Sequence, residues 1–254
     1  MKPIHIFLIF AISLILTICF VRACQEDYDS EQTQESISYS NVDDHEQSIG
    51  TNTNSDIVTT WPDSIYNIVA DVSYLSQLDK DVIIEINKCR TNPSRYAEEV
   101  LVPFKNRFTS SNMYIDEDGF NIRTEEGITA VEEAIEALLK HQPQPMLRPK
   151  QYLCLAAADH CSDQGPTGYI GHGGSDGSSP MMRVLRHTKA CNGVGENIAY
   201  GDSKGVGIIR GLIIDDGVRD RGHRENTFHN YRYVGTAFGK HKTFRYMCVI
   251  DFEL

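Results

Sequence analysis

The chain ends in two segments that decide its fold class: residues 233–240 read YVGTAFGK, and residues 245–252 read RYMCVIDF. Both segments are rich in β-branched and aromatic residues, and only four residues separate them. This composition predicts two strands joined by a turn. The chain before them has a different pattern, so the fold class follows from how the two patterns combine.

Upstream of these strands, apolar residues recur at the spacing that is typical of helices. Helices are expected over residues 82–89, 124–139, 150–162 and 206–212. Thr124 is placed to cap the second of them. Because helices come first and strands last, the sequence predicts an α+β fold.

The composition of the 254 residues excludes several classes of protein. Hydrophobic residues make up 41% of the chain and charged residues 23%, as in an ordinary soluble globular protein. The formal net charge is -11, whereas a general nucleic-acid binder needs an excess of positive charge to neutralise phosphates. We therefore expect no nucleic-acid partner.

The negative charge is concentrated near the N-terminus. Residues 25–65 contain ten Asp or Glu and no Lys or Arg. They are also rich in Ser, Thr, Gln and Asn, so they bury too little apolar surface to offset the entropy of an ordered chain. We interpret residues 24–65 as a disordered acidic spacer and residues 66–254 as the folded domain.

Residues 1–23 have the features of a secretory signal peptide. Lys2 precedes an apolar run over residues 6–21, and the residues Val-Arg-Ala at 21–23 place small side chains before a cleavage at Cys24. The run is shorter than the roughly 20 residues that a spanning helix needs. We expect secretion, with no transmembrane helix in the mature chain. The less favoured alternatives are an uncleaved membrane anchor and a lipid anchor at Cys24.

Secretion also bears on the cysteines. Removal of the signal leaves Cys24, Cys89, Cys154, Cys161, Cys191 and Cys248. Extracellular cysteines tend to pair, so we expect disulfides, although the spacing does not fix their connectivity. Cys154 and Cys161 are excluded as a pair, because they are seven positions apart on a predicted helix and thus about 10.5 Å apart along its axis, beyond the limit of about 7 Å between Cα atoms.

Three segments downstream combine glycine with histidine or acidic residues: 171–180, 195–201 and 215–226. We expect them to be loops whose glycines allow close approach of the backbone to a site. Imidazole and carboxylate groups together suit a divalent metal or acid/base catalysis. They also suit plain hydrogen bonding between loops, and the spacing alone leaves these alternatives open.

Six short motifs occur in order from about residue 80 to the C-terminus. They are INxxRxNP at 86–93, AAADH at 156–160, GH at 171–172, GENI at 195–198, GHR at 222–224 and CVIDF at 248–252. In this order they resemble the CAP or SCP domain superfamily of cysteine-rich secretory proteins, antigen 5 and plant pathogenesis-related proteins. The DDGV motif at 215–218, before RGHR, is similar to one bacterial and protist branch. The resemblance implies an α-β-α sandwich with an antiparallel central sheet.

The resemblance also implies a cleft that carries two histidines and two acids. The expected members of this tetrad are His172, Glu196, Asp215 and His223. Asp216 is an alternative for the second acid, and His160 matches a recurrent family residue that lies on a helix. Some relatives hold a divalent cation in the cleft, so His172 and His223 are expected as metal ligands, with Zn²⁺ as the first candidate.

Two functions follow from this reading. We expect a secreted, non-catalytic module that binds an extracellular ligand, either a lipid or sterol in an apolar groove or a protein. The alternative is a metal-dependent, protease-like hydrolase in which His172 and His223 hold the ion and Glu196 acts as the base. The second acid is not fixed between Asp215 and Asp216, which favours the binding module.

Overall fold

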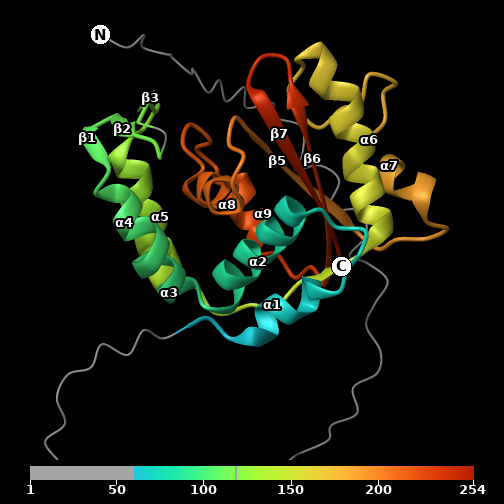
Figure 1. Cartoon of the computed structure of the whole chain (residues 1–254), viewed down its shortest axis with the longest axis horizontal. Coiled ribbons are helices and arrows are strands. Elements are labelled where there is room, and N and C mark those ends of the chain that lie inside the picture. The colour runs from blue at the N-terminus through green and yellow to red at the C-terminus, as the bar shows by residue number, and fades with distance from the viewer. Residues whose placement is uncertain (1–59, 118) are drawn as a thin grey trace, which may run out of the picture. The chain divides into compact units, whose positions relative to one another are not determined.

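A four-stranded sheet in the order β4-β6-β7-β5 forms the centre of the computed structural model, which describes residues 60–117 and 119–254 (Figure 1). The predicted strands are β6 (Tyr233–His241) and β7 (Arg245–Glu253), and they pair antiparallel. β5 (Val194–Tyr200) pairs antiparallel with the other edge of β7. The short β4 (Arg148–Pro149) runs parallel to β6. The hairpin predicted from composition is therefore the middle of the sheet.

Helix α6 (Gln151–Thr167) covers one face of this sheet and lies on β6 and β7. Met247 and Val249 of β7 belong to the apolar cluster beneath it. At Gly235 of β6, an added Cβ would lie only 2.3 Å from backbone atoms of α6, so glycine is needed for this close approach. α7 (Pro180–His187) packs against α6 and β5 and completes this layer.

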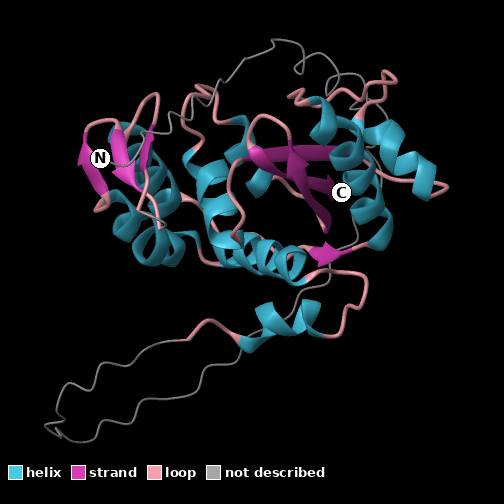
Figure 2. Ribbon diagram, turned by 45° about the horizontal axis from the view of Figure 1, so that its top comes forward, coloured by secondary structure: helices cyan, strands magenta, loops and turns pink. Residues whose placement is uncertain are grey.

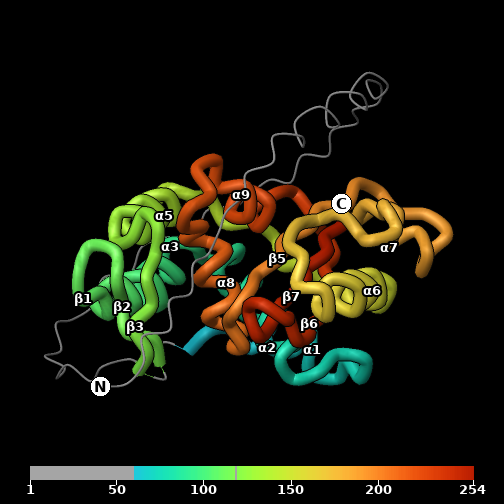
Figure 3. The backbone as a smooth tube through the Cα atoms, turned by 90° about the horizontal axis from the view of Figure 1, so that it is seen from above, coloured from blue at the N-terminus to red at the C-terminus, as the bar shows by residue number. Residues whose placement is uncertain are grey.

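The opposite face of the sheet carries the larger part of the hydrophobic core. Cys248 and Ile250 point there, because successive side chains of a strand alternate between faces. Helices α2 (Gln77–Thr91), α8 (Gly205–Ile214) and α9 (Gly222–Phe228) form this layer. Figure 3 shows β5, β6 and β7 between α6 on one side and α8 on the other. The expected α-β-α sandwich with an antiparallel central sheet is confirmed.

Helix α2 begins at a capping box. The hydroxyl of Ser76 accepts a hydrogen bond from the N–H of Asp79 (3.2 Å), and the Asp79 carboxylate accepts one from the N–H of Ser76 (3.1 Å). A short helix, α1 (Asp63–Ala70), precedes it and buries Ile65. α1 begins before residue 66, where the composition suggested that the domain starts.

Two side chains of the INxxRxNP motif tie α2 to distant loops. Asn87 accepts a hydrogen bond from the N–H of Leu147 (2.7 Å) and donates one to its carbonyl (3.0 Å). The Arg90 guanidinium, fully buried, donates to the carbonyls of Thr227 (2.5 Å) and His229 (2.9 Å), at the end of α9. These bonds satisfy buried backbone carbonyls and fix α9 against α2.

A group of shorter elements joins α2 to β4 (Figure 2). In chain order they are α3 (Pro93–Tyr96), a π-helical turn (Ala97–Leu101), α4 (Val102–Lys105), β1 (Phe108–Ser110), β2 (Met113–Ile115), β3 (Asn121–Arg123) and α5 (Ile128–Lys140). β1, β2 and β3 form a small antiparallel sheet. The sequence does not predict this sheet, because its three-residue strands are largely exposed and too short to show alternation.

Helix α5 begins at Ile128 rather than at Thr124, where the sequence predicts its cap. The carboxylate of Asp216 accepts hydrogen bonds from the N–H groups of residues 125–127, at distances of 2.7, 2.8 and 3.0 Å. Gly127 has a φ of 73°, outside the helical region. The bonds to Asp216 and this positive φ hold the segment in a non-helical turn.

The five described cysteines all carry free thiols, which corrects the expectation of disulfides among them. Four of them, Cys89, Cys154, Cys161 and Cys248, are buried, and Cys191 is partly exposed. The buried four are packed as small apolar side chains of the core. Cys161 and Cys248, for example, belong to clusters on opposite faces of the sheet.

Some predictions fall on residues 1–59, outside the described part of the chain. They are the signal peptide at 1–23, the acidic spacer as far as residue 59, and any bond made by Cys24. Within residues 60–117 and 119–254, no helix is both long enough and apolar enough to span a bilayer.

Candidate functional site

The loop that carries His172 is fixed at Gly171, a few residues after α6. The Gly171 carbonyl accepts hydrogen bonds from Nε2 of His160 (2.9 Å) and Nε2 of Gln164 (2.5 Å), both on α6. Its N–H donates to the hydroxyl of Tyr200 on β5 (3.1 Å). Gly171 has a φ of 107°, which L side chains rarely adopt. These hydrogen bonds and the positive φ therefore fix the backbone conformation immediately before His172.

His172 and Glu196 form the first of two histidine–carboxylate pairs. Nδ1 of His172 lies 2.8 Å from Oε1 of Glu196. The Glu196 side chain is 1% exposed, whereas that of His172 is 51% exposed. A carboxylate only accepts hydrogen bonds, so Nδ1 carries the proton and donates it. Nε2 is then the ring nitrogen that keeps a free lone pair.

Arg183 of α7 holds the second oxygen of Glu196. Its Nη2 donates to Oε2 at 2.6 Å, and both side chains are 1% exposed. Its Nη1 donates to the carbonyls of His172 and Ser178, each at 3.1 Å. Burial raises the pKa of Glu196, but the hydrogen bond from His172 and the charge of Arg183 outweigh burial and hold that pKa below its ordinary value. Glu196 is therefore ionised.

Residues 195–201 differ from the sequence-based expectation of a loop, because residues 194–200 form β5. The segment pairs along its whole length with β7, and this pairing overrides the local signal of its glycines. Alternation along the strand sends Glu196 toward α7 and Asn197 toward α9. Nδ2 of Asn197 donates to the carbonyl of His223 (2.9 Å), so one strand contacts both histidine-bearing segments.

Asp215 and His223 form the second pair. Oδ1 of Asp215 lies 2.6 Å from Nδ1 of His223, and Oδ2 accepts the backbone N–H of His223 at 2.9 Å. The Asp215 side chain is 3% exposed and that of His223 is 25% exposed. Asp215 directly follows α8, as its C-cap, and has a φ of 57°. The sequence predicts a loop around His223, but the residue lies in the first turn of α9, where the Asp215 carboxylate accepts a free N–H.

The two alternative residues occupy other positions. Asp216 binds the backbone of residues 125–127, so Asp215 is the acid that contacts His223. His160 is fully buried and uses Nε2 on the Gly171 carbonyl, while its Nδ1 has no hydrogen-bond partner among the described residues. Burial lowers the pKa of His160, which keeps the ring neutral.

Both pairs share one arrangement, in which Nδ1 of an imidazole binds a buried carboxylate and Nε2 is left for another group. Metal-binding histidines are commonly held in this way, with the carboxylate on one nitrogen and the metal on the other. Among residues 60–117 and 119–254, no cluster of three or more His, Cys, Asp or Glu side chains has the arrangement of a complete metal site.

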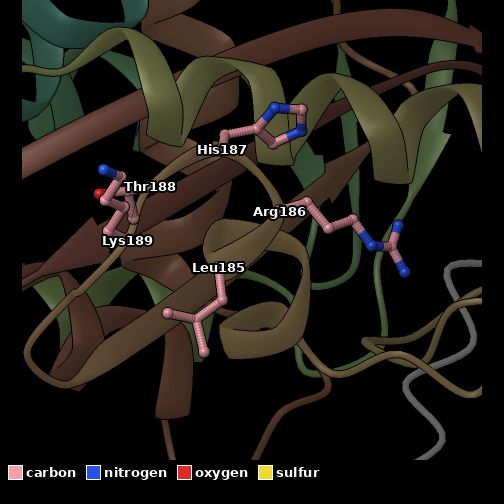
Figure 4. A pocket seen from close by; sticks show the side chains of 5 residues that line it. All are labelled: Leu185, Arg186, His187, Thr188 and Lys189. Carbon is pink, nitrogen blue, oxygen red and sulfur yellow. The ribbon is translucent and has the colours of Figure 1, made fainter.

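Two surface hollows lie near α7. The larger, of about 630 Å³, is lined by residues 185–189. Figure 4 shows that its side chains Leu185, Arg186 and His187 point in different directions rather than toward a common centre. The smaller hollow, of about 360 Å³, is lined by eight residues that include Arg183. Neither hollow is lined by His172 or His223, so the two pairs are not part of them.

Two buried charged residues beside Glu196 were not predicted as part of a site. They are Arg183 and Asp251, which are 1% and 0% exposed. Asp251 had a visible signal, because it is the only charged residue in the apolar run over 247–252. Arg183 follows two methionines in a short helix, and nothing in that pattern distinguishes it from the exposed Arg186.

A comparison with known protein families assigns the chain to one of them. The profile of CAP, the cysteine-rich secretory protein family, matches residues 85–252, more than half of the chain. Among curated protein sequences, none matches.

Two solved structures resemble parts of the chain. The crystal structure of an extracellular protein with an SCP domain from Bacillus anthracis is 21% identical; the match covers 50% of this chain and 38% of that one, with a TM-score of 0.37. An outer surface protein from Borrelia burgdorferi is 18% identical; the match covers 49% of this chain and 86% of that one, with a TM-score of 0.36. The match thus spans well under half of the Bacillus chain.

Proposed function

Because the chain belongs to the CAP family of cysteine-rich secretory proteins, we propose that it is a secreted binding module that holds a divalent cation through His172 and His223. One observation carries the proposal: each imidazole binds a nearly fully buried carboxylate through Nδ1. The carboxylate fixes the tautomer and the ring orientation, so Nε2 is ready to bind a metal without a proton being displaced.

Zn²⁺ is the first candidate for this cation. Imidazole nitrogen is a common zinc ligand, and zinc sites that are not purely structural keep at least one position open. Two protein nitrogens leave the remaining positions for water or for donor atoms of a bound partner. The proposed role of the metal is therefore to help bind an extracellular ligand, and a lipid, a sterol or a protein all remain candidates.

The hydrolase alternative has less support. Its base would be Glu196, but one oxygen of that carboxylate binds His172 and the other binds Arg183. The side chain is also 1% exposed, so water has little access to it. A general base must reach the proton that it removes. These contacts favour a holding role for Glu196.

The test is zinc binding by calorimetry, with the metal content of the purified protein measured in parallel. We expect the wild type to bind Zn²⁺, and His172→Ala and His223→Ala each to lose binding while keeping the far-UV circular dichroism of the wild type. His187→Ala is the matched control, because His187 also pairs with a carboxylate, that of Asp159 at 2.9 Å. Equal zinc affinity in all four proteins would show that the pairs only tie segments together.

Secretion is tested separately, by N-terminal sequencing of protein recovered from the medium of expressing cells. The proposal expects a mature chain that starts at or near Cys24. A protein that stays with the cells and keeps Met1 would contradict it.

A further inference from the structure

Asp251 is a carboxyl group buried in the middle of the sheet without a conventional partner. It lies on β7, its exposed fraction is 0%, and neither of its oxygens has a hydrogen-bond donor among the described residues. An ionised carboxylate in such a place is strongly disfavoured unless a cation or several donors surround it. The structure must therefore stabilise this residue in another way.

The sheet places Asp251 beside Glu196. Glu196 of β5 and Gly235 of β6 are its two cross-strand neighbours. Directly opposed residues share a face, with Cβ atoms about 4.5–5.5 Å apart. Gly235 has no side chain, and the backbone of α6 fills the space above it. Glu196 is therefore the side chain that Asp251 meets across the strands.

The charges around the two carboxyls do not balance if both are ionised. Arg183 of α7 is the cation that acts on both, and its Nη2 is already bound to Glu196. The other titratable groups that face them are His172, whose Nδ1 donates to Glu196, and three groups of α6: His160, kept neutral by burial, and the thiols of Cys154 and Cys161. Burial raises the pKa of Asp251 well above its ordinary range, and the neighbouring Glu196 charge adds to the effect.

We propose that Asp251 is a neutral carboxylic acid in the folded protein, and that it donates its proton in a hydrogen bond to Glu196. A single proton on Asp251 removes one buried charge and also gives the pair of carboxyl groups a hydrogen-bond donor. Glu196 receives three hydrogen bonds, from His172, Arg183 and Asp251. Asp251 is thus a positioning residue that keeps the Glu196 carboxylate aimed at Nδ1 of His172.

This inference concerns how Glu196 is held, and it does not depend on whether a metal binds. Its test uses metal-free protein, so failure of the zinc proposal and failure of this one are distinguishable. Two substitutions that keep the branch of the side chain at Cγ test donation. Asp251→Asn keeps a donor, because its amide N–H replaces the acid O–H, whereas Asp251→Leu removes it.

The first measurement is the infrared difference spectrum between the wild type and Asp251→Asn near neutral pH. We expect the carbonyl-stretch band of a protonated carboxylic acid in the wild type and its loss in Asp251→Asn. Asp159→Asn, which changes a partly exposed, ion-paired acid, should leave the band unchanged. Absence of the band from the wild type, or its persistence in Asp251→Asn, would overturn the proposal.

The second measurement is ¹⁵N NMR of His172, which reports which ring nitrogen carries the proton. We expect the Nδ1–H form in the wild type and in Asp251→Asn, and a mixture of the two tautomers in Asp251→Leu. A wild-type tautomer ratio in Asp251→Leu, or its loss in Asp251→Asn, would refute the positioning role. If Asp251→Leu does not fold, Asp251→Ala, which also lacks the donor, takes its place in this comparison.

Discussion

At the scale of the residue, the protonation of Asp251 leads to a pH dependence of stability with a defined sign. The pKa of this carboxyl in the folded protein lies well above the value of about 3.9 expected for the unfolded chain. At a pH below both pKa values, the carboxyl is protonated in the folded and in the unfolded state, so it does not change the free energy of unfolding. As the pH rises through about 4, only the unfolded chain loses the proton, so the folded state of the wild type loses stability.

Asp251→Asn has no such proton to lose. We expect its free energy of unfolding to rise relative to that of the wild type between about pH 4 and 7, by at most about 1.4 kcal/mol per pH unit. Urea unfolding of both proteins across this pH range provides the measurement. A difference that does not change with pH would contradict the prediction.

Arg183 is the residue on which the first histidine–carboxylate pair depends most. Arg183→Met removes the cation from a fully buried ion pair and frees the carbonyls of His172 and Ser178. We expect a loss of about 3–5 kcal/mol, because Glu196 is left as an uncompensated buried charge.

Arg186→Met is the control for this substitution. Arg186 lies on the same helix, pairs with Asp176 and Asp159, and has a side chain that is 42% exposed. We expect a change below about 1 kcal/mol. Chemical denaturation measures the free energy of unfolding of both variants. Equal losses would show that the buried Arg183–Glu196 pair stabilises the fold no more than the exposed pairs of Arg186.

At the scale of the element, the two adjacent acids that follow α8 have separate roles. Asp215 binds Nδ1 of His223, whereas Asp216 binds backbone N–H groups of the turn before α5. We expect Asp215→Asn to lower zinc affinity about 10- to 100-fold, as loss of a carboxylate behind a metal-binding histidine generally does. Asp216→Asn should keep that affinity and instead lower the stability by about 1–3 kcal/mol, because backbone N–H groups lose their acceptor.

Calorimetry and denaturation of the same two variants separate these roles. The opposite pattern, with zinc affinity lost in Asp216→Asn and kept in Asp215→Asn, would reverse the assignment of the second acid.

Elements whose signal is local were predictable from the sequence, and elements that depend on partners were not. β6 and β7 carry dense β-branched and aromatic residues, and α6 carries a long apolar face, so each is visible in isolation. β5 contains GEN, which is typical of a turn, and becomes a strand only because β7 provides pairing over its whole length. The candidate site follows the same division: family order predicted its histidines and Asp251 stands out in its apolar run, whereas Arg183 becomes apparent only when α7 is packed on β5.

At the scale of the whole molecule, the distance between α6 and the sheet is set by a missing side chain. Gly235→Ala would place a methyl group 2.3 Å from the backbone of Leu153 and Cys154, so the helix must move outward. We expect a loss of about 1–3 kcal/mol or more from this overpacking. Displacement of α6 also loosens Gly171, because two α6 side chains hold its carbonyl.

Gly211→Ala is the matched control, since Gly211 lies in α8 and an added Cβ meets nothing within 4 Å. This change should be neutral or stabilise the protein by up to about 1 kcal/mol, because alanine favours helix over glycine. Thermal unfolding compares both variants with the wild type. Similar melting temperatures for the two would contradict the tight spacing of α6.

The alternation of β5 has a consequence for how this protein can change over evolutionary time. Glu196 serves the His172 segment and Asn197 serves the His223 segment from opposite faces of one strand. Insertion or deletion of a single residue in β5 exchanges the two faces and separates both segments from their anchors at once. Length variation is therefore expected in the surrounding loops, while the strand itself accepts substitutions but not a change of one in its residue count.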